Sequence, residues 1–545
     1  MSQLRRRQCV STWVSSLSLC SGLGLACDDD DTSTLREPTR LTSGAIELGP
    51  ELPPDVDTAE QARLTNEGKF PSVQRLFDEL SWQSFIALNW PQAGSGQPAP
   101  RLTDEGTLLW ETYSESYEVF KPDGTTPDPY GSPRQTLPAI TDAGLPNAGT
   151  DVLPAQQHRV LHNISAVDSL NVVDEVNQAF SSPLWDQYGN LVHYEVLLNQ
   201  PEYDYIAQHE LYNRQGQVAF AAANDGKVQL PAGRFGTSDL GAIEVKLAWR
   251  VLTPDDIPER YLVRRAFIVV EDPVRWQEVS VGLVGMHISH KTVSSPQWIW
   301  STFEHVDNLD VDSFAAFGPD SESHPKRASF YDPDCEYCPV NVVPKADAAG
   351  KLKTQVSRAV PIPKATQAFN AEVQALLRAA DSPLQYYELI NTQWPTEPTA
   401  PPAATYSFPE NITNKSGGRP TPVYLINSTM ETYFQSGASK SGNSMTDDVS
   451  LVVGTDPPVS IPSTNGGNTP LRYAEGFCES LDPAGDCREA ANELVFSTES
   501  CMGCHSSASI YVAGSGTNPS DYESGEQLSG DFSWLFAQKA AVRTD

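Results

Sequence analysis

The sequence predicts an α+β protein, with a β-rich antiparallel sheet or sandwich as its body, flanking helices and a small helical C-terminal region. Three observations support this fold class. Runs of alternating apolar and polar residues dominate positions 107–310, two longer segments have the apolar spacing of amphipathic helices, and shorter helical segments occur near the C-terminal end.

The first helix is expected over residues 71–90. Five apolar side chains recur there at the spacing of one helix face, and Pro91 ends the pattern. These residues are Leu76, Phe77, Leu80, Phe85 and Leu88. A second helix is expected over 367–391, and short helices are expected within 488–510 and 532–542.

Four neighbouring segments have the alternation of half-buried strands. In 242–252, apolar and polar residues alternate along the run, as side chains on opposite faces of a sheet require. The segments 261–270, 278–290 and 297–305 continue this pattern and are separated by Pro and Asp. Closely spaced strands of this kind favour antiparallel pairing.

Length and charge limit the function classes. A chain of 545 residues has room for two or three domains, and 39% hydrophobic residues is ordinary for a soluble globular protein. The formal net charge is -33, and no run of Lys and Arg is long enough to follow a phosphate backbone. Nucleic acid is therefore not expected as a partner, whereas an acidic surface would attract basic partners.

The N-terminal residues predict export. Arginines at positions 5–7 are followed by a moderately apolar stretch that is too short and too rich in Ser and Gly for a membrane span. The segment 23–27 resembles a bacterial lipobox, which implies a lipoprotein acylated on Cys27, although Gly24 stands where Leu is preferred. Ordinary cleavage of the signal peptide nearby, or an uncleaved anchor, are the alternatives.

Four segments follow from these patterns. They are an export signal over 1–27, a disordered tether over 28–70, a β-rich body over 71–410 and a C-terminal region over 411–545. The tether is inferred from its Asp-, Thr-, Pro- and Glu-rich composition without apolar periodicity. We expect the protein in the periplasm, or at the outer membrane or cell surface of a bacterium, with membrane contact only through a lipid on Cys27.

Six cysteines remain beyond the N-terminal segment, as three close pairs. In an exported chain, Cys478 with Cys487 and Cys335 with Cys338 most simply form disulfides, although crossed pairing between the two sets stays open. A thioredoxin-like redox motif is the alternative for Cys335 and Cys338. The Asp- and Pro-rich surroundings of that pair favour a loop over the helix start that such a motif needs.

The third pair has the strongest chemical signal. Cys501, Cys504 and His505 stand in the C-x-x-C-H spacing, in which two thiols reach the vinyl groups of one porphyrin and the next residue ligates its iron. In this motif the chain resembles c-type cytochromes. The resemblance implies one covalent haem c, attached to both cysteines, with His505 as an iron ligand. A zinc half-site, or a disulfide beside an incidental histidine, are the alternatives.

The second axial ligand of the iron is open. Residues after His505 include neither Met nor His, so a ligand must come from upstream. Met286, Met430 and Met445 are the available methionines, and Met430 is preferred because it lies in an apolar segment close before the motif. Packing in a hydrophobic core is the other role for Met430. An open or water-filled sixth position is the remaining alternative and would permit chemistry at the iron.

A second polar cluster lies in the strand region. His287, His290, Glu304 and His305 are concentrated near Trp298 within a short stretch. On one strand, His287 and His290 would point to opposite faces. The functional hypothesis is a metal site or a haem-facing pocket with acid–base side chains. The structural alternative, which we favour, is buried and hydrogen-bonded polar side chains among aromatic neighbours.

These observations lead to two main functional hypotheses. The first is an exported monohaem c-type cytochrome-like protein in electron transfer, with a redox partner protein. The second is a haem-dependent oxidoreductase, peroxidase- or oxygenase-like, with a pocket in the β-rich body, because electron transfer alone needs only about one small domain. A weaker alternative is a surface binding protein with a structural haem. The sequence leaves open whether the chain is an enzyme.

Overall fold

The structure is a computed structural model of the 545-residue chain. It describes residues 37–43, 46–94, 96–132, 159–161, 182–271, 274–309, 328–335, 338, 340–358, 362–398, 419–420, 425–435, 478–481, 487–489, 501–506 and 508–543. The chain divides into Met1–Glu37 and a compact unit, Pro38–Asp545, and the elements described below belong to that unit. Residues 1–27, for which an export signal is predicted, lie outside the described residues.

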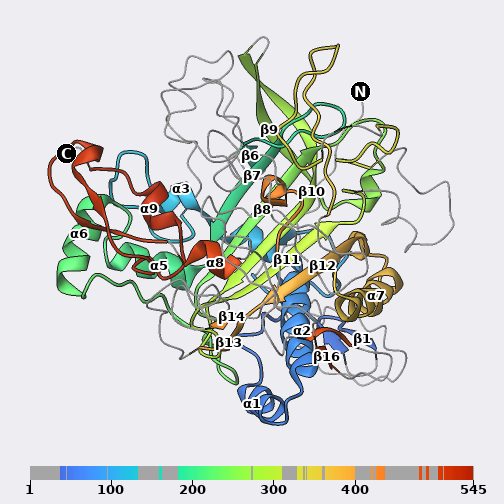
Figure 1. Ribbon diagram of the computed structural model, residues 1–545, viewed down its shortest axis with the longest axis horizontal. Coiled ribbons are helices and arrows are strands. Elements are labelled where there is room, and N and C mark those ends of the chain that lie inside the picture. Colours follow the sequence, from blue (N-terminus) through green and yellow to red (C-terminus); the bar gives the residue numbers. More distant parts are fainter. Residues whose placement is uncertain are drawn as a thin grey trace, which may run out of the picture. The chain divides into compact units, whose positions relative to one another are not determined.

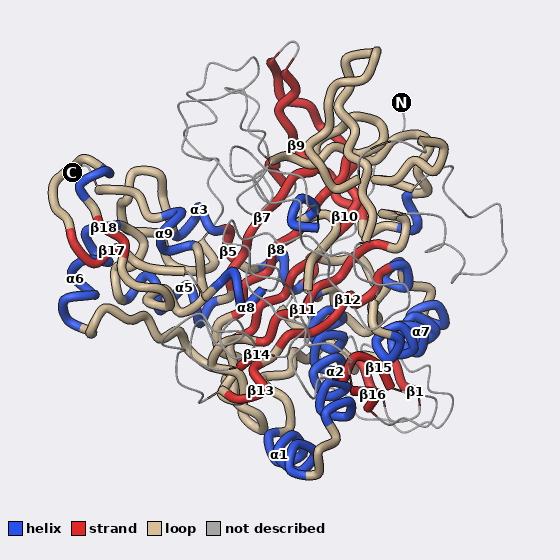
Figure 2. Tube along the Cα trace, viewed as in Figure 1, coloured by secondary structure: helices blue, strands red, loops and turns tan. Residues whose placement is uncertain are grey.

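A single large sheet forms the centre of this unit (Figure 2). Its strands are β5 (Ser114–Glu115), β6 (Arg159–Leu161), β7 (Val192–Leu198), β8 (Ile243–Val251), β9 (Val263–Glu271), β10 (Val274–His290), β11 (Ile299–His305) and β12 (Tyr387–Gln393). All described pairs are antiparallel except β6 with β9. The four segments predicted as antiparallel strands are therefore confirmed as β8 to β11, and the α+β class is confirmed.

The 17-residue strand β10 joins two parts of the sheet. Its first half pairs with β9, and its second half lies between β8 and β11. From there the strand order runs β12, β11, β10, β8, β7 and β5. The register shifts between Leu283 and Gly285, where β10 changes from one pairing to the other.

Alternation gives the sheet two chemically different faces. On one face, which we call the α2 face, the side chains of Val245, Leu247, Met286 and Phe303 are buried in one hydrophobic cluster. The opposite face, which we call the site face, has polar and charged residues at the intervening positions of β8 and β10. Side chains at successive strand positions point to opposite faces, so each strand contributes to both.

Helices cover the α2 face. They are α2 (Phe70–Leu88) and α7 (Lys364–Ala379), which pack against β12, as Figure 1 shows. The helix predicted over 71–90 is confirmed as α2. The helix predicted over 367–391 is correct only in its first part, because α7 is followed by a 3-10 turn and then by β12. Apolar residues of β12 also fit helical spacing, which is why the boundary was misplaced.

The predicted tether needs correction where the structure describes it. Residues in this stretch form β1 (Leu41–Ser43), β2 (Ile46–Leu48) and α1 (Thr58–Asn66). Asp57 caps α1 by accepting hydrogen bonds from the backbone N–H groups of Ala59 and Glu60. Local capping and packing of Leu48 and Leu64 therefore order a segment whose composition alone indicates a solvated chain.

The remaining described helices accompany the C-terminal region. They are α3 (Ser116–Val119), α5 (Gln200–Gln208), α6 (Arg214–Ala223), α8 (Cys501–His505) and α9 (Leu535–Lys539). Figure 1 shows α5 and α6 beside the C-terminal chain, and Arg214 donates hydrogen bonds to the carbonyls of Ala540 and Pro519. The helices predicted over 488–510 and 532–542 are correct only in part, as α8 and α9, because Arg488 and Glu489 belong to the strand β16 (Cys487–Glu489). Among the described residues, no helix is long and apolar enough to cross a membrane.

Five small antiparallel hairpins complete the described secondary structure. Besides β1 with β2, they are β3 (Pro91–Gln92) with β4 (Thr107–Leu108), β13 (Pro395–Glu397) with β14 (Arg419–Pro420), β15 (Cys478–Leu481) with β16 (Cys487–Glu489), and β17 (Tyr511–Ala513) with β18 (Glu523–Ser524). The pair β17 and β18 packs beside α6.

Replacing Arg250 should destabilise the fold strongly. Its guanidinium is fully buried and pairs with the carboxylates of Asp186 and Asp256. Arg250→Met leaves both carboxylates buried without their counter-charge, and we expect a loss of ~3–5 kcal/mol in the free energy of unfolding, measured by urea denaturation. The control is Arg265→Met, which removes an exposed pair with Glu278 and should cost at most ~1 kcal/mol. Equal losses for both variants would contradict a stabilising role for the buried charges.

Candidate functional site

The C-x-x-C-H motif forms α8, a five-residue helix at the site face of the sheet. Cys501 and Cys504 carry thiols and are partly exposed. Met502, between them, is buried, and its backbone N–H donates a 2.9 Å hydrogen bond to Oε1 of Gln393 at the end of β12. These contacts attach the motif to the sheet, with Cys501 and Cys504 only partly exposed.

His505 is oriented by two contacts. Its Nδ1 lies 2.8 Å from the carbonyl oxygen of Phe532, and its ring lies 4.3 Å from that of Trp300 on β11. A donating Nδ1–H leaves Nε2 as the atom with a lone pair, which is the tautomer that a metal-ligating histidine uses. Burial lowers the pKa of His505 to about 4, although the hydrogen bond to Phe532 opposes the shift. The imidazole is therefore neutral at neutral pH and suited to ligate a metal.

A row of polar side chains lies opposite the motif. Lys246 of β8 and Thr302 of β11 pair across the sheet with His287 of β10, so the three share the site face. Nε2 of His287 lies 3.5 Å from a carboxylate oxygen of Glu431. His287, Lys246 and Glu431 all contribute to the electrostatic environment of His505. The site face therefore brings an acid–base pair and a cation close to the motif.

Glu431 belongs to a turn that packs on the site face. Burial alone would raise the pKa of its carboxyl, but His287 and Lys246 outweigh this and lower it. Its side chain also accepts a 2.8 Å hydrogen bond from the backbone N–H of Asn427. Burial, and then the nearby Glu431 charge, raise the pKa of the Cys501 thiol. The carboxylate thus connects the turn, the histidine of β10 and the motif electrostatically.

The turn approaches the sheet closely because position 285 is a glycine. A Cβ at Gly285 would lie 2.4 Å from Oγ1 of Thr429, well inside contact distance. The turn is also held by Asn427, which donates to the carbonyl of Phe303, and by Tyr194, whose hydroxyl donates to the carbonyl of Thr429. Gly285 therefore permits the approach that sets Glu431 beside the motif.

Of the four candidate catalytic residues, the structure brings only His287 to the motif. Glu304 accepts hydrogen bonds from Arg358 and from the backbone N–H of Ser428. It therefore anchors the turn and balances the positive charge of Arg358. His305 is fully buried and stacks on Tyr261 at 4.0 Å. These contacts match the structural alternative for Glu304 and His305.

His290 also has a structural environment. Its Nε2 lies 2.6 Å from the carbonyl oxygen of Leu240, and its side chain is almost completely buried. Burial lowers the pKa of His290 to about 4. Three positions separate it from His287, so the two point to opposite faces of β10, as expected from the strand period.

The methionines differ in their surroundings. Met430 is fully buried in a hydrophobic cluster with Tyr194, Val284 and Phe330, a cluster that does not include the motif. Met286 lies on the α2 face, and Met445 lies outside the described residues. The surroundings of Met430 therefore correspond to its core-packing role.

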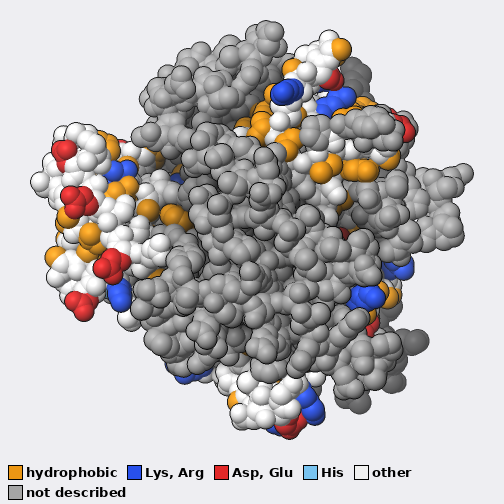
Figure 3. Space-filling view, viewed as in Figure 1, with side chains coloured by type: hydrophobic (Ala, Val, Ile, Leu, Met, Phe, Trp, Pro, Cys, Tyr) orange, Lys and Arg blue, Asp and Glu red, His pale blue; other side chains and the backbone are white. Residues whose placement is uncertain are grey.

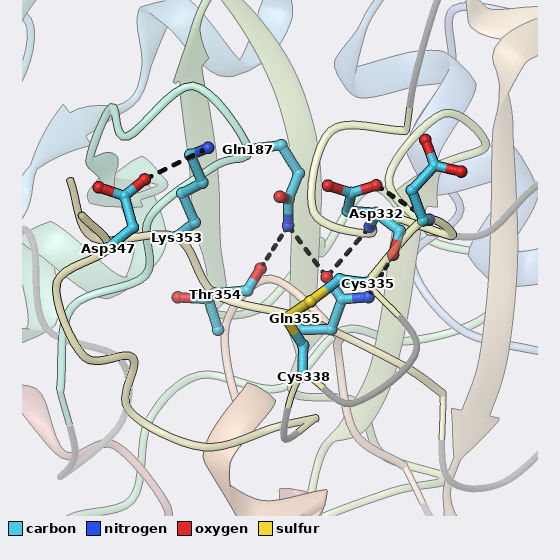
Figure 4. The surroundings of a disulfide bond; sticks show 9 residues. Gln187, Asp332, Cys335, Cys338, Asp347, Lys353, Thr354 and Gln355 are labelled. Atoms are coloured by element: carbon cyan, nitrogen blue, oxygen red, sulfur yellow. Dashed lines mark hydrogen bonds and ion pairs between the residues drawn. A yellow bond between two sulfur atoms is a disulfide. The ribbon is translucent and has the colours of Figure 1, made fainter. Parts of the chain in front are cut away.

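Cys335 and Cys338 form a disulfide, as expected, with their Cα atoms 5.5 Å apart. Figure 4 shows it beside Gln355, which donates to the carbonyl of Asp332 and receives hydrogen bonds from the backbone N–H of Asp332 and from Gln187. No described helix begins at this pair, so it is a loop disulfide. The side chains of the other pair, in β15 and β16, lie outside the described residues.

The residues of the motif fit a covalently attached haem. Two thiols three positions apart, a neutral imidazole with its Nδ1 already hydrogen-bonded, and an aromatic neighbour are the donor set that such a group needs. A zinc site would need further ligands, and within the described ranges no group of three or more His, Cys, Asp or Glu is arranged to hold a metal ion.

Sequence reasoning missed several residues of this site. Lys246, Gln393, Glu431 and Phe532 come from four separate segments that only folding brings together. The alternation of β8 could have placed Lys246 on a polar face, but it could not indicate which segment covers that face.

Acid should destabilise the fold through His290 and His305. Burial lowers the pKa of each to about 4 from an ordinary value near 6.5, so the unfolded chain binds more protons between these values. Above about pH 6.5 both histidines are neutral in the folded and the unfolded chain, so they cause no loss of stability. As the pH drops from there towards 4, the free energy of unfolding falls by roughly 3 kcal/mol per histidine. Urea denaturation from pH 7 to pH 4 measures this loss.

Substitution separates this effect from other titrations. His305→Asn should be less stable than the unchanged protein at pH 7 and should lose less stability on acidification. His209→Gln, at the partly exposed end of α5, is the control and should keep the full dependence. Identical pH dependence in His305→Asn and the unchanged protein would contradict the assignment.

Comparisons with known proteins identify no relative: no family model matches the chain, and neither the curated proteins nor the solved structures contain a match.

Proposed function

We propose that this chain is an exported monohaem c-type cytochrome-like protein that transfers electrons. One haem c is attached through Cys501 and Cys504, and His505 is an iron ligand. When bound, the haem supplies a one-electron Fe(III)/Fe(II) couple. The single observation that carries the proposal is the geometry of α8, in which two thiols and a hydrogen-bonded, neutral histidine lie within one short helix.

The chain's own residues prepare this site in distinct ways. The carbonyl of Phe532 fixes the orientation of His505 and holds the proton on Nδ1. Gln393 anchors the helix through the backbone N–H of Met502, and Trp300 limits the movement of the imidazole. These contacts hold the ligating nitrogen of His505 in position before any cofactor binds. The protein around the iron would therefore rearrange less when the charge of the iron changes.

For the second iron ligand, the surroundings of the two side chains favour His287 over Met430. His287 faces the motif together with Glu431, whereas Met430 packs in a separate hydrophobic cluster. Glu431 lies close enough to orient His287, which would hold the iron together with His505. If the iron instead keeps an open position, the same pair provides an acid–base group, which favours the haem-dependent oxidoreductase as the second candidate function.

A basic redox partner fits the surface beside the site. Figure 3 shows Asp and Glu side chains on the part formed by α6 and the C-terminal residues, where Asp225, Asp521, Glu523 and Glu526 are exposed. With a net charge of -33, the chain attracts cationic surfaces over distances near the Debye length. The disulfide of Cys335 and Cys338 supports an oxidising compartment such as the periplasm.

Replacing both motif cysteines should abolish covalent haem. The double variant Cys501→Ala/Cys504→Ala lacks both thioether-forming thiols, so haem should be absent from the chain on a denaturing gel stained for haem. The matched control is Cys335→Ala/Cys338→Ala, which removes the other C-x-x-C pair and should keep the stained band. A stained band of unchanged strength in the motif variant would overturn the proposal.

Replacing His287 distinguishes the two candidate functions. If His287 ligates the iron, the reduced protein is low-spin and does not bind carbon monoxide, and His287→Ala converts it to a form that does. Met430→Leu is the control and should leave the absorption spectrum unchanged. A reduced protein that already binds carbon monoxide contradicts axial ligation by His287 and favours the oxidoreductase.

A further inference from the structure

Two buried carboxyl side chains, Glu202 and Glu244, lack ordinary hydrogen-bond partners. Glu202 of α5 is completely buried, and neither of its carboxyl oxygens has a hydrogen-bond partner. Glu244 lies on the site face of β8, where one of its oxygens is likewise buried and unpartnered. Each carboxyl group shifts the pKa of the other, so the two lie close together. A hydrogen bond between them would require a proton, because two carboxylates cannot donate to each other.

The charged groups around Glu202 and Glu244 do not neutralise two ionised carboxylates. Lys291, at the end of β10, is the nearby cation, and its Nζ lies 2.5 Å from both carboxylate oxygens of Asp531. Asp531 also accepts a 2.7 Å hydrogen bond from the backbone N–H of Leu230. Three carboxyl groups therefore surround one ammonium group that is already paired. Two further buried negative charges would be costly, and a bound proton removes one of them.

The electrostatic shifts agree with this geometry. Burial, and then the Glu244 charge, raise the pKa of Glu202 well above its ordinary range. Burial also raises the pKa of Glu244, against the opposing effects of hydrogen bonds from Glu202 and Ser533. Asp531 acts on both groups by repulsion. The pair therefore holds a proton more tightly than two separate, solvated carboxyl groups would.

One short segment connects this pair to the motif. Asp531 bonds to Lys291, the carbonyl of the next residue, Phe532, contacts His505, and Ser533 bonds to Glu244. Three consecutive residues therefore touch the carboxyl cluster and the iron ligand. Through this segment, a change of charge at the motif would alter the proton affinity of the pair.

We propose that Glu202 and Glu244 form a proton-binding site whose occupancy is coupled to the oxidation state of the redox centre at His505. This inference rests on the proposed function. In the pH range where the oxidised protein keeps an ionised carboxylate in the pair, a one-electron donor, the redox partner or a soluble mediator, would reduce Fe(III) to Fe(II), and one proton from solvent would then form an O–H bond with that carboxylate oxygen. No other bond is made or broken, and oxidation returns the proton to solvent. Glu244, which is partly exposed, provides the route.

The test measures the midpoint potential of the haem-bearing full chain against pH, with soluble mediators. In the unchanged protein, the reduction equilibrium should change up to tenfold per pH unit in the range where the pair titrates. In Glu202→Gln/Glu244→Gln the pair cannot exchange a proton, and the pH dependence should decrease. An identical dependence in both proteins would overturn the coupling.

A matched control is Asp78, a buried carboxyl group in the helix α2, on the other side of the sheet from the Glu202–Glu244 pair. Burial raises the pKa of Asp78 in α2 to about 6, and its partners are Gln74 and Thr366. Asp78→Asn should leave the dependence of the potential on pH unchanged. A loss equal to that in the double variant would show that the effect is not specific to the Glu202 pair, and would also overturn the proposal.

A second measurement is independent of the haem. The infrared spectrum of the full chain should contain a carboxylic acid C=O band at neutral pH that disappears in Glu202→Gln, with unchanged circular dichroism. Absence of the band would overturn the proton site even if haem is attached. Absence of covalent haem with the band present would overturn the proposed function and the coupling, and leave the shared proton established.

Discussion

The chemistry proposed for this molecule depends on the alternation of side chains along β10. Met286 and Ile288 point to the α2 face and are buried in its hydrophobic cluster, so the residue between them, His287, must point to the other face. The strand pairs with β8 and β11 over this stretch. Its register is fixed because the apolar side chains of all three strands must lie on the same, buried face of the sheet. A shift of one residue would bury His287 under α2 and expose Met286, so the hydrophobic core itself sets the position of the polar site.

Periodicity predicted the parts of the fold that follow from local pattern. The strands β8 to β11 and the helix α2 were predicted close to their observed bounds, because apolar spacing there agrees with the tertiary structure. The boundary after α7 was wrong, since Leu384 and Leu389 continue the apolar pattern through a turn and into β12. The order in residues 37–70 was missed because capping by Asp57 and contacts with distant segments are not visible in composition.

Only the C-x-x-C-H motif of the candidate site was predictable from the sequence. The spacing of Cys501, Cys504 and His505 is local, whereas the groups that face them come from the sheet and from the turn that ends at Glu431. Of the polar residues expected in a wall at 287–305, the structure brings His287 to the motif, and the other three have structural contacts. Apolar groups over Lys246, His287 and Glu244 would bury their polar atoms without hydrogen-bond partners, which costs free energy. A polar segment therefore covers this face of the sheet.

The long-range bonds of the segment 531–533 also have a kinetic meaning. Asp531 accepts a hydrogen bond from Leu230, 301 positions earlier, and Arg214 bonds to Ala540 across 326 positions. Contacts of such high sequence separation need large loops to close, so they form late in folding. We expect the central sheet to assemble before the segment 531–533 contacts His505. If haem is attached as proposed, the thiols of Cys501 and Cys504 would then be accessible to the attaching enzymes before this segment packs against the sheet.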